Sequence, residues 1–477
     1  MSLSSALNIA LTGLQATTTA MGIVSGNISN ASTPGYTEKS VNYSTVTSGG
    51  GIEGGVEISG YTRATNQAVT ASLNTATSSA SYYSTQYNYL QQVQSILDSS
   101  SSNPTLSSDI SNFQTDFASY ADNAENSVQQ QTVINDGNKL AKDIQSINSQ
   151  VTSLSTQVSN DVQTNIKSLN ADLATIQTLN TQISNASSSN QPTGDLQDQL
   201  ATAVNAVSAI TNVTVMPRSN GQIALYTPSG TALVDGTAQT FSFDGTNITN
   251  SAGANVTSGL TGGSLQAQLN FISTSASAAS STDPGTGVIV KLQSQLQTLV
   301  TAFTGTSSAF ATAYKNAANA STATGGTQNG DTVPTSFFTV TVNGTTPDIS
   351  SFQVNAQLLN STGSLPQTGL QAVTNSFTST ANYTASGLSV NGATYATLGT
   401  SILSNFQAAA NSLQSTSSDA TSQQSFYQTA LANTTGVNTD SELVALTTLQ
   451  NSYAASAHII TTIENMYSAL ENIGTTA

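Results

Sequence analysis

Few residues in this chain have the types and spacing that catalysis or metal binding requires. The single histidine, His458, has no cysteine, serine motif or acidic cluster near it in sequence that would complete a triad or a metal site. Asp195 and Asp198 lie three positions apart, at i and i+3 on one face of a predicted helix. The helix dipole favours carboxylates in this first turn, and a metal or acid–base pair is the alternative interpretation. We therefore expect no enzyme activity, no cofactor and no metal site.

A glycine-rich stretch at residues 49–54 formally matches the G-x-G-x-x-G pattern of dinucleotide-binding loops. Such a loop needs a buried strand before it and a helix that opens from it. Neither is indicated here, because residues 56–58 alternate like a strand instead. We interpret the stretch as a flexible turn.

The composition excludes several classes of partner. Charged residues make up 7% of the 477 residues, and 24 acidic against 8 basic residues give a net charge of −16. The basic residues are scattered singly, so we expect no binding to nucleic acid or to an anionic membrane. No apolar run approaches the roughly 20 residues that span a bilayer. The absence of cysteine excludes disulfides, and the N-terminus lacks the pattern of a cleaved signal peptide.

The first 36 residues contain no charged side chain and carry apolar residues at heptad spacing. Pro34 lacks an N–H and pushes the preceding residue out of the α region, so this helix is predicted to end by about residue 32. A seam this narrow needs partner helices to be stable. Its predicted residues are Leu3, Leu7, Ala10, Leu14, Met21, Val24 and Ile28.

The chain closes, within residues 437–473, on a second heptad helix of about 30 residues. The two terminal seams are predicted to pair with each other, and each leaves a face for neighbours. His458 lies off the seam, so it is expected to face solvent or a neighbouring subunit. The predicted seam residues are Leu446, Leu449, Tyr453, Ile460, Ile463, Tyr467 and Leu470.

Between the two ends, the periodicity predicts long helices and a small β unit. Apolar residues at 3–4 spacing over 140–183 predict one long helix that needs antiparallel neighbours to cover its stripe. Near residue 211 the period changes to two, with Asn220-Gly221 and Asp244-Gly245 as hairpin turns. Further helices are expected at 69–98, 105–135, 288–314, 398–413 and 426–431, with a linker at 318–336 and irregular chain at 343–394.

These elements predict an elongated, mainly α fold with a β-rich part. It would consist of a terminal α-helical coiled coil, a long antiparallel helix bundle and a small β domain. The expected parts are residues 1–36 with 437–477 (coiled coil), 37–210 with 265–320 and 398–436 (helical rod), 211–264 (β-hairpin unit) and 321–397 (turn-rich outer region).

Both ends of the chain carry motifs that resemble those of flagellar axial proteins. Residues 25–36, SGNISNASTPGY, resemble the N-terminal signature of rod, hook and hook-associated proteins. Residues 436–443 and 449–457, GVNTDSEL and LQNSYAASA, resemble the closing helix of the same group. Within 176–200, IQTLNTQI and DLQDQL are similar to segments of the FlgK family, the hook-associated proteins 1 of the hook–filament junction. Thr37-Glu38-Lys39 and Gly137 depart from the family pattern, which usually has Arg or Gln after the tyrosine and Ala in the helix.

The resemblance implies a structural protein outside the cell. It implies export through the flagellar type III apparatus without a cleaved signal, and assembly at the hook tip beneath the filament. The implied partners are further copies in a ring or helical layer, hook protein below, hook-associated protein 3 above and an export chaperone. The alternatives are another axial subunit, from hook or rod, and a secreted adhesin or effector that shares these ends. Besides the two seams, the implied assembly residues are Asn27, Asn30, Pro34, Gly35 and Tyr36.

Overall fold

The computed structural model describes the chain in five stretches and is mainly α-helical with small antiparallel sheets, which confirms the predicted fold class. The chain divides into two compact units. Unit 1 comprises Met1–Ala80, Ile166–Gly263 and Ala420–Ala477, and unit 2 comprises Ser81–Asn165 and Ser264–Asp419. The four-part division remains a prediction. The described residues are 3–48, 52–98, 106–189, 191–323 and 332–475.

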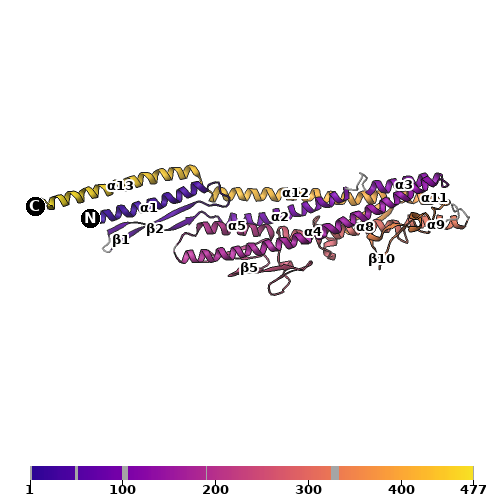
Figure 1. Ribbon diagram of the computed structural model, residues 1–477, viewed down its shortest axis with the longest axis horizontal. Helices are drawn as coiled ribbons and strands as arrows, with labels where there is room; N and C mark the ends of the chain where they lie inside the picture. The colour runs from indigo at the N-terminus through magenta and orange to yellow at the C-terminus, as the bar shows by residue number, and fades with distance from the viewer. Residues whose placement is uncertain (1–2, 49–51, 99–105, 190, 324–331, 476–477) are drawn as a thin grey trace. The chain divides into compact units, whose positions relative to one another are not determined.

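In unit 1 the two terminal helices lie side by side with a β-hairpin (Figure 1). Helix α1 (Leu3–Asn30) ends close to the predicted residue 32. It contacts α13 (Thr439–Thr475) and both strands of the hairpin, β1 (Lys39–Ser48) and β2 (Ile52–Arg63). The predicted strand at residues 56–58 lies in β2, whereas residues 49–51 of the glycine-rich stretch lie outside the described residues.

Unit 1 contains a small β region, which confirms the strands predicted from the change to a hydrophobic period of two near residue 211. Its four-stranded sheet has the order β3-β4-β5-β6, and β7 pairs with β8 in a separate hairpin. The predicted turns at 220–221 and 244–245 connect β3 to β4 and β7 to β8. The bounds are α5 (Gly194–Ile210), β3 (Thr214–Pro217), β4 (Ile223–Tyr226), β5 (Ala232–Asp235), β6 (Thr237–Ala238), β7 (Phe241–Phe243), β8 (Ile248–Asn250) and the 3₁₀ turn η1 (Thr257–Gly259).

Two asparagines of the long helix α4 (Ser127–Ser188) hold this β region. Asn180 donates its amide to the carbonyl of Ile223 (2.9 Å) and accepts the Ile223 N–H (3.0 Å). Asn170 makes the same pair of hydrogen bonds with Phe241, at 2.8 and 2.9 Å. The side-chain amides thus satisfy backbone groups that the short strands leave without a ladder partner.

Three long helices each contribute several turns to both units: α4, α2 (Gln67–Asp98) and α12 (Tyr395–Thr435). The prediction of one long helix over 140–183 is confirmed, because α4 is continuous over 62 residues. The two helical stretches expected at 398–413 and 426–431 form the single helix α12. The polar residues between them continue a helix because no Gly or Pro interrupts it.

The prediction of a single helix over 288–314 is wrong, because this region forms two helices, α8 (Val288–Thr304) and α9 (Ala309–Ala323). Gly305 caps α8, and the Ser308 hydroxyl accepts the Ala311 N–H at the start of α9. The first part of the linker expected over 318–336 is instead helical, since α9 reaches Ala323, and residues 324–331 lie outside the described residues. The other elements of unit 2 are α3 (Leu106–Asp122), α6 (Gly263–Ile272), α7 (Ala276–Ser280), β9 (Phe338–Thr339), β10 (Val342–Asn343), β11 (Thr346–Pro347), η3 (Ile349–Ser351), β12 (Gln353–Val354), α10 (Ala356–Leu359), α11 (Leu370–Thr378), β13 (Ala381–Ala385) and β14 (Leu388–Ala393).

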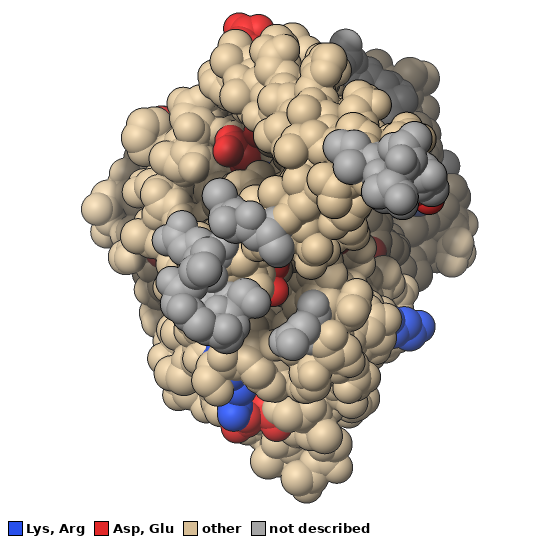
Figure 2. All heavy atoms as spheres, turned by 90° about the vertical axis from the view of Figure 1, so that its left-hand side faces the viewer, with Lys and Arg blue, Asp and Glu red and all other residues tan. Residues whose placement is uncertain are grey.

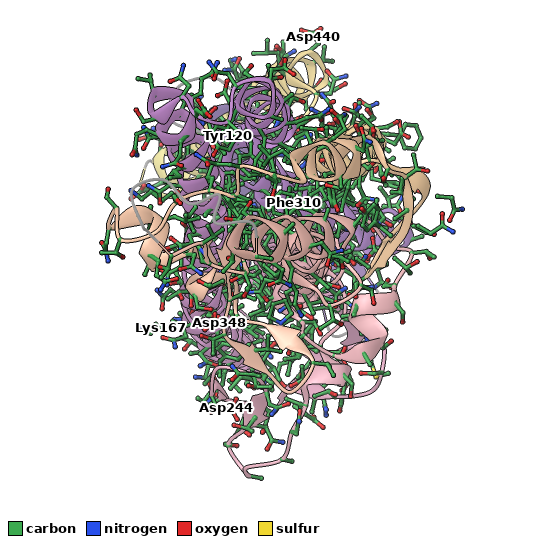
Figure 3. All side chains as sticks on the ribbon, turned by 90° about the vertical axis from the view of Figure 1, so that its right-hand side faces the viewer. Tyr120, Lys167, Asp244, Phe310, Asp348 and Asp440 are labelled. Carbon is green, nitrogen blue, oxygen red and sulfur yellow. The ribbon has the colours of Figure 1, made fainter. Side chains whose placement is uncertain are left out.

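The core of unit 2 is an aromatic cluster. Phe113 of α3 packs against Phe310 and Phe337, with ring centroids 5.8 and 5.0 Å apart. Figure 3 shows Phe310 among the packed helices. Gly137 of α4 makes room for these rings, because a Cβ there would lie 2.7 Å from Phe337 Cζ. This close approach explains why a glycine stands at this position inside a long helix.

Candidate functional site

Helices α1 and α13 form an antiparallel pair. Ser4 lies within hydrogen-bond distance of Tyr467 at one end (3.2 Å between the hydroxyls), and Asn27 contacts Glu442 at the other. Between them, Gly13 lies beside Ser456. The structure therefore confirms the predicted pairing of the two terminal heptads.

The predicted seam residues fall into three groups of exposure. Ala10, Asn27 and Ile463 are buried, and Ile463 is the only buried apolar residue among the described positions of α13. A pair of helices with one hairpin leaves most seam positions partly open to solvent. Half-buried are Leu3, Leu7, Leu14, Met21, Val24, Ile28, Asn30, Tyr36, Leu446, Leu449 and Ile460, and exposed are Pro34, Gly35, Tyr453, Tyr467 and Leu470.

The hairpin β1–β2 covers a second side of α1. The N–H of Val56 donates to the Thr12 hydroxyl at 3.4 Å. Gly55 has φ +128°, and a Cβ there would lie 3.3 Å from the Cβ of Thr12 and closer still to the Thr12 hydroxyl oxygen. Glycine is therefore required for strand β2 to approach the helix this closely. Sequence reasoning placed only residues 56–58 in a strand, because the bulges in both strands break the period-two alternation.

The signature after α1 folds into a turn that returns toward the helix. Asn30 donates to the Gly26 carbonyl (3.0 Å) and accepts from the Thr33 hydroxyl (3.2 Å). Gly35 adopts φ +81°, a conformation that favours glycine. The turn thereby brings the Tyr36 hydroxyl to Asn27, whose Oδ1 accepts it at 3.0 Å.

Asn27 is fully buried and connects three segments of unit 1. Its Oδ1 accepts from the Tyr36 hydroxyl and from the Lys39 N–H (3.1 Å). Its Nδ2 donates to the Lys39 carbonyl (2.8 Å) and to Glu442 Oε1 (3.0 Å). Asparagine offers two donors and two acceptor sites, so all four are used. The signature of α1 is thus joined directly to the start of α13.

Glu442 occupies the first turn of α13, where the helix dipole favours a carboxylate. It is 7% exposed, and its Oε2 has no hydrogen-bond partner among the described residues. Burial raises the pKa of Glu442, the hydrogen bond from Asn27 opposes this rise, and the charge of Glu38 adds to it. Asn438 caps the same turn by accepting the Asp440 N–H at 3.1 Å.

An ion-pair network joins α5 to the hairpin. Asp198 binds Lys39 Nζ at 3.0 Å, Arg63 Nε at 2.6 Å and the Thr37 hydroxyl at 2.7 Å. Asp195, whose side chain is 79% exposed, binds Lys39 Nζ at 2.7 Å. The carboxylate pair that suggested a helix-dipole role or a metal site is therefore engaged by cations of the same chain.

Lys39 is the residue through which this network reaches the signature. Its ammonium lies 3.5 Å from the centre of the Tyr36 ring, a cation–π contact. Burial works to lower the pKa of Lys39, but its bonds to Asp195 and Asp198 outweigh that effect and leave the pKa raised. Lys39 thus serves contacts within the chain, to both aspartates of α5 and to the signature tyrosine.

Sequence reasoning missed Glu442, Lys39, Arg63 and the role of Asp198. Their partners lie 135 to 415 positions away, so no local pattern reveals them. The sequence did offer one signal. Only 7% of the residues are charged, so a charged residue next to a signature is rarely there by chance and calls for a partner.

The described residues show no other arrangement that suggests chemistry. They contain no group of three or more His, Asp or Glu side chains placed to hold a metal ion. His458 is exposed, as predicted from its place off the seam. Among the helices described, none is long and apolar enough to cross a membrane.

Comparison with known families extends the resemblance. The family model for the flagellar hook-associated protein FlgK helical domain matches residues 90–338, more than half of the chain. The chain belongs to the FlgK family of flagellar hook-associated proteins. Models of the flagella basal body rod protein and of the flagellar basal body rod FlgEFG protein C-terminal region match residues 7–37 and 428–473. These two matches contain Asn27 and Glu442, so the Asn27–Glu442 contact joins the two axial-protein ends of this FlgK-family chain.

The similar individual proteins are named flagellar hook-associated protein 1. Flagellar hook-associated protein 1 of Salmonella typhimurium is 28% identical over 240 residues, which are 49% of this chain and 43% of that protein. The Escherichia coli K12 protein of this name is 26% identical, over 49% of this chain and 44% of its own length. The match thus spans less than half the length of these relatives. The hook junction protein FlgK from Burkholderia pseudomallei is 25% identical, with a TM-score of 0.41 over 52% of this chain and 44% of that one.

Proposed function

We propose that this chain is a structural subunit of the bacterial flagellum at the junction between hook and filament. Membership of the FlgK family supports this, as does the name of the relatives, flagellar hook-associated protein 1. The proposal includes export by the flagellar type III apparatus and a position between hook protein and hook-associated protein 3. It also includes capture by an export chaperone before assembly.

The distribution of exposed apolar side chains carries the assembly part of this proposal. Of the fifteen large hydrophobic side chains that are exposed among the described residues, twelve lie in unit 1. Seven of these are on α13, from Leu443 to Leu470. Exposed apolar residues concentrated on one element are typical of a surface that another protein covers. Unit 1 is therefore the part through which we infer that the subunit assembles.

The low charge of the surface is consistent with close packing of many copies. The face shown in Figure 2 bears few Lys, Arg, Asp or Glu side chains. With a net charge of −16 on 477 residues, copies that met through charged faces would repel one another. Uncharged helices avoid that repulsion where subunits touch.

Deletion in the source bacterium tests the proposal. Cells in which residues 3–36 are removed from the chain should secrete flagellin instead of polymerising it, and should lose motility. Replacement of residues 211–263 by a short linker is the control, since it removes a longer segment that lies outside the terminal helices. Filaments of ordinary length on the cells with the terminal deletion would contradict the proposal. Immunogold labelling along the whole hook, instead of one band at its end, would favour a hook subunit.

A further inference from the structure

Unit 2 contains a polar hollow that is open to solvent. Its volume is about 290 Å³, close to the lower end of the range of small-molecule pockets, roughly 300–1,000 Å³. Six of its eight described lining residues are polar, and one of these is charged. The hollow therefore has the size and the chemistry for a small polar ligand. The lining residues are Asn148 of α4, Gln293 and Gln297 of α8, Asn343 of β10, Thr346 and Pro347 of β11, Asp348 and Ile349.

Hydrogen bonds from neighbouring residues hold the walls of the hollow in place. Gln145 lies three positions before Asn148, on the same face of α4. Its amide donates to the carbonyls of Ser350 and Phe352, at 2.9 and 3.0 Å. Asp348, labelled in Figure 3, accepts the Ser350 N–H through Oδ1 at 3.0 Å. The loop after β11 is thus fixed against α4, so the hollow exists before a ligand arrives, which lowers the cost of binding.

The side chains that line the hollow keep most of their hydrogen-bonding groups free. In contrast to the asparagines of α4 that hold the β region, four lining amides make no side-chain hydrogen bond to any described residue. Gln293 and Gln297 lie one turn apart, so their amides project from the same face of α8. Asp348 Oδ2 is likewise without a partner among the described residues. Only water or a ligand can pair with these groups. The four amides are those of Asn148, Gln293, Gln297 and Asn343.

The lining favours a neutral ligand. No Lys or Arg side chain lines the hollow, so an anion would meet only the carboxylate of Asp348. A metal ion would meet that one carboxylate alone, because the described residues contain no group of acidic side chains placed to hold a metal. A ligand with many hydroxyl groups fits the lining, since an amide and a hydroxyl each donate and accept. Pro347 and Ile349 supply an apolar surface for its C–H groups.

We propose that this hollow binds a neutral monosaccharide or disaccharide, either free or at the end of a glycan. The amides of Gln293 and Gln297 bind hydroxyls on neighbouring ring carbons, and Asp348 Oδ2 accepts a further hydroxyl. All lining residues belong to unit 2, whereas the assembly surface proposed above belongs to unit 1. The site and the proposed function can therefore fail independently of each other.

Saturation-transfer NMR on the purified full chain tests the site. The probes are the methyl glycosides of glucose, galactose, mannose and N-acetylglucosamine. At least one should bind with a dissociation constant on the order of 1 mM, since so small a ligand makes few contacts. Absence of saturation transfer to all four would overturn the proposal. Retention of the chain on immobilised glycans that end in the bound sugar would assign the site to glycan ends, and binding of the methyl glycoside alone would assign it to free sugars.

Substitution in the lining places the sugar in this hollow. Gln293→Met with Gln297→Met removes both amides and keeps side chains of similar length. We expect binding of the glycoside to weaken at least tenfold, with an unchanged midpoint of thermal unfolding. The matched control is Gln150→Met, two positions after Asn148 on α4 and outside the lining, which should bind normally. Unchanged binding by the double variant, or equal weakening by the control, would overturn the proposal.

Deoxy analogues of the bound glycoside give a second measurement, on the unsubstituted chain. At least one analogue should bind tenfold more weakly than the parent sugar, because the missing hydroxyl leaves an amide or the carboxylate unpaired. Equal binding of all the deoxy analogues would show that the site does not recognise hydroxyls, and would overturn the proposal.

Discussion

Asn27 and Glu442, 415 positions apart in the sequence, are joined by a side-chain hydrogen bond of 3.0 Å. One residue belongs to the signature at the end of α1 and the other to the first turn of α13. Because both are buried, the bond exists only when the two ends of the chain are folded against each other. The two ends of the chain therefore fold together as one cooperative unit. Substitution of either residue should change the free energy of unfolding of that unit.

Replacing Asn27 by alanine should weaken unit 1 more than any other change in the signature. The substitution removes four hydrogen bonds and leaves the Tyr36 hydroxyl and the Lys39 N–H without their acceptor. We expect a loss of about 2–4 kcal/mol in the free energy of unfolding, measured by urea titration. Asn30→Ala is the control, because the Asn30 side chain bonds, among the described residues, only to Gly26 and Thr33, and it should lose less than about 1 kcal/mol. Equal losses for the two variants would contradict the role assigned to Asn27.

Replacing Glu442 by glutamine should stabilise the contact at neutral pH. Glutamine keeps the acceptor for Asn27 and removes a buried charge whose second oxygen has no partner among the described residues. We expect a gain on the order of 1 kcal/mol at pH 7. Since the pKa of Glu442 is raised by burial, the folded state takes up its proton first as the pH falls. The advantage of glutamine should therefore shrink on acidification, as the unsubstituted chain becomes neutral at this position.

The control for this variant is Glu442→Ala, which removes the acceptor as well as the charge. It should destabilise unit 1 at pH 7 because Asn27 then has a buried donor without a partner. Hydrogen exchange of the α1 amides localises both effects to the terminal pair. A glutamine variant less stable than the alanine variant would contradict the expected sign.

The ion pairs of α5 should differ greatly in their contribution to stability. Asp198→Ala leaves Lys39 and Arg63 without their buried acceptor, and we expect a loss of about 3–5 kcal/mol. Asp195→Ala removes a pair whose carboxylate is 79% exposed, so the loss should be below about 1 kcal/mol and should vanish at high salt. Thermal unfolding at low and high salt measures both. Similar losses for the two aspartates would show that Asp198 is not the centre of the network.

The elements with strong periodicity could be predicted from sequence, and the contacts that hold the signature could not. In α1, α13 and α4, regularly spaced apolar residues mark the face of the helix that is buried. The local sequence pattern was therefore enough to predict these helices and the pairing of the two ends. The hairpin at residues 39–63 was mostly missed because bulges and glycines interrupt its alternation. The partners of Asp198 and Glu442 depend on tertiary contacts across more than a hundred residues, for which one sequence holds no local signal.

Gly137→Ala should destabilise unit 2, against the usual preference of helices for alanine. Alanine normally adds up to about 1 kcal/mol to an exposed helix position. Here its Cβ would lie 2.7 Å from Phe337 Cζ and 3.2 Å from Phe113 Cε2, so the aromatic cluster must shift. We expect a net loss of about 1–3 kcal/mol by thermal unfolding. Gly22→Ala in α1 is the control with open space around the added methyl, and it should stabilise; stabilisation by both would contradict the packing described.

Unit 2 should become more stable on mild acidification. Asp109 and Asp116 of α3 face Asp136, Lys139 and Asp143 of α4, and Lys139 forms ion pairs with two of these carboxylates, Asp109 and Asp143. Burial is the main cause that raises the pKa of Asp109 to about 6, against the pull of Lys139, and burial likewise raises the pKa of Asp136 to about 6, helped by Asp116. In the unfolded chain both carboxyls titrate near their ordinary value, about 4.

The folded unit therefore binds protons between pH 7 and 5 that the unfolded chain does not bind. Its free energy of unfolding should rise as the pH falls through this range, by about 1–2 kcal/mol in urea titrations at pH 7 and pH 5. Asp109→Asn should remove a large part of this pH dependence, because the amide is neutral at both pH values. Asp122→Asn, at an exposed position on the same helix, should leave it unchanged. A free energy of unfolding that falls between pH 7 and pH 5 in the unsubstituted chain would show that the buried carboxylates of α3 and α4 remain ionised over this range.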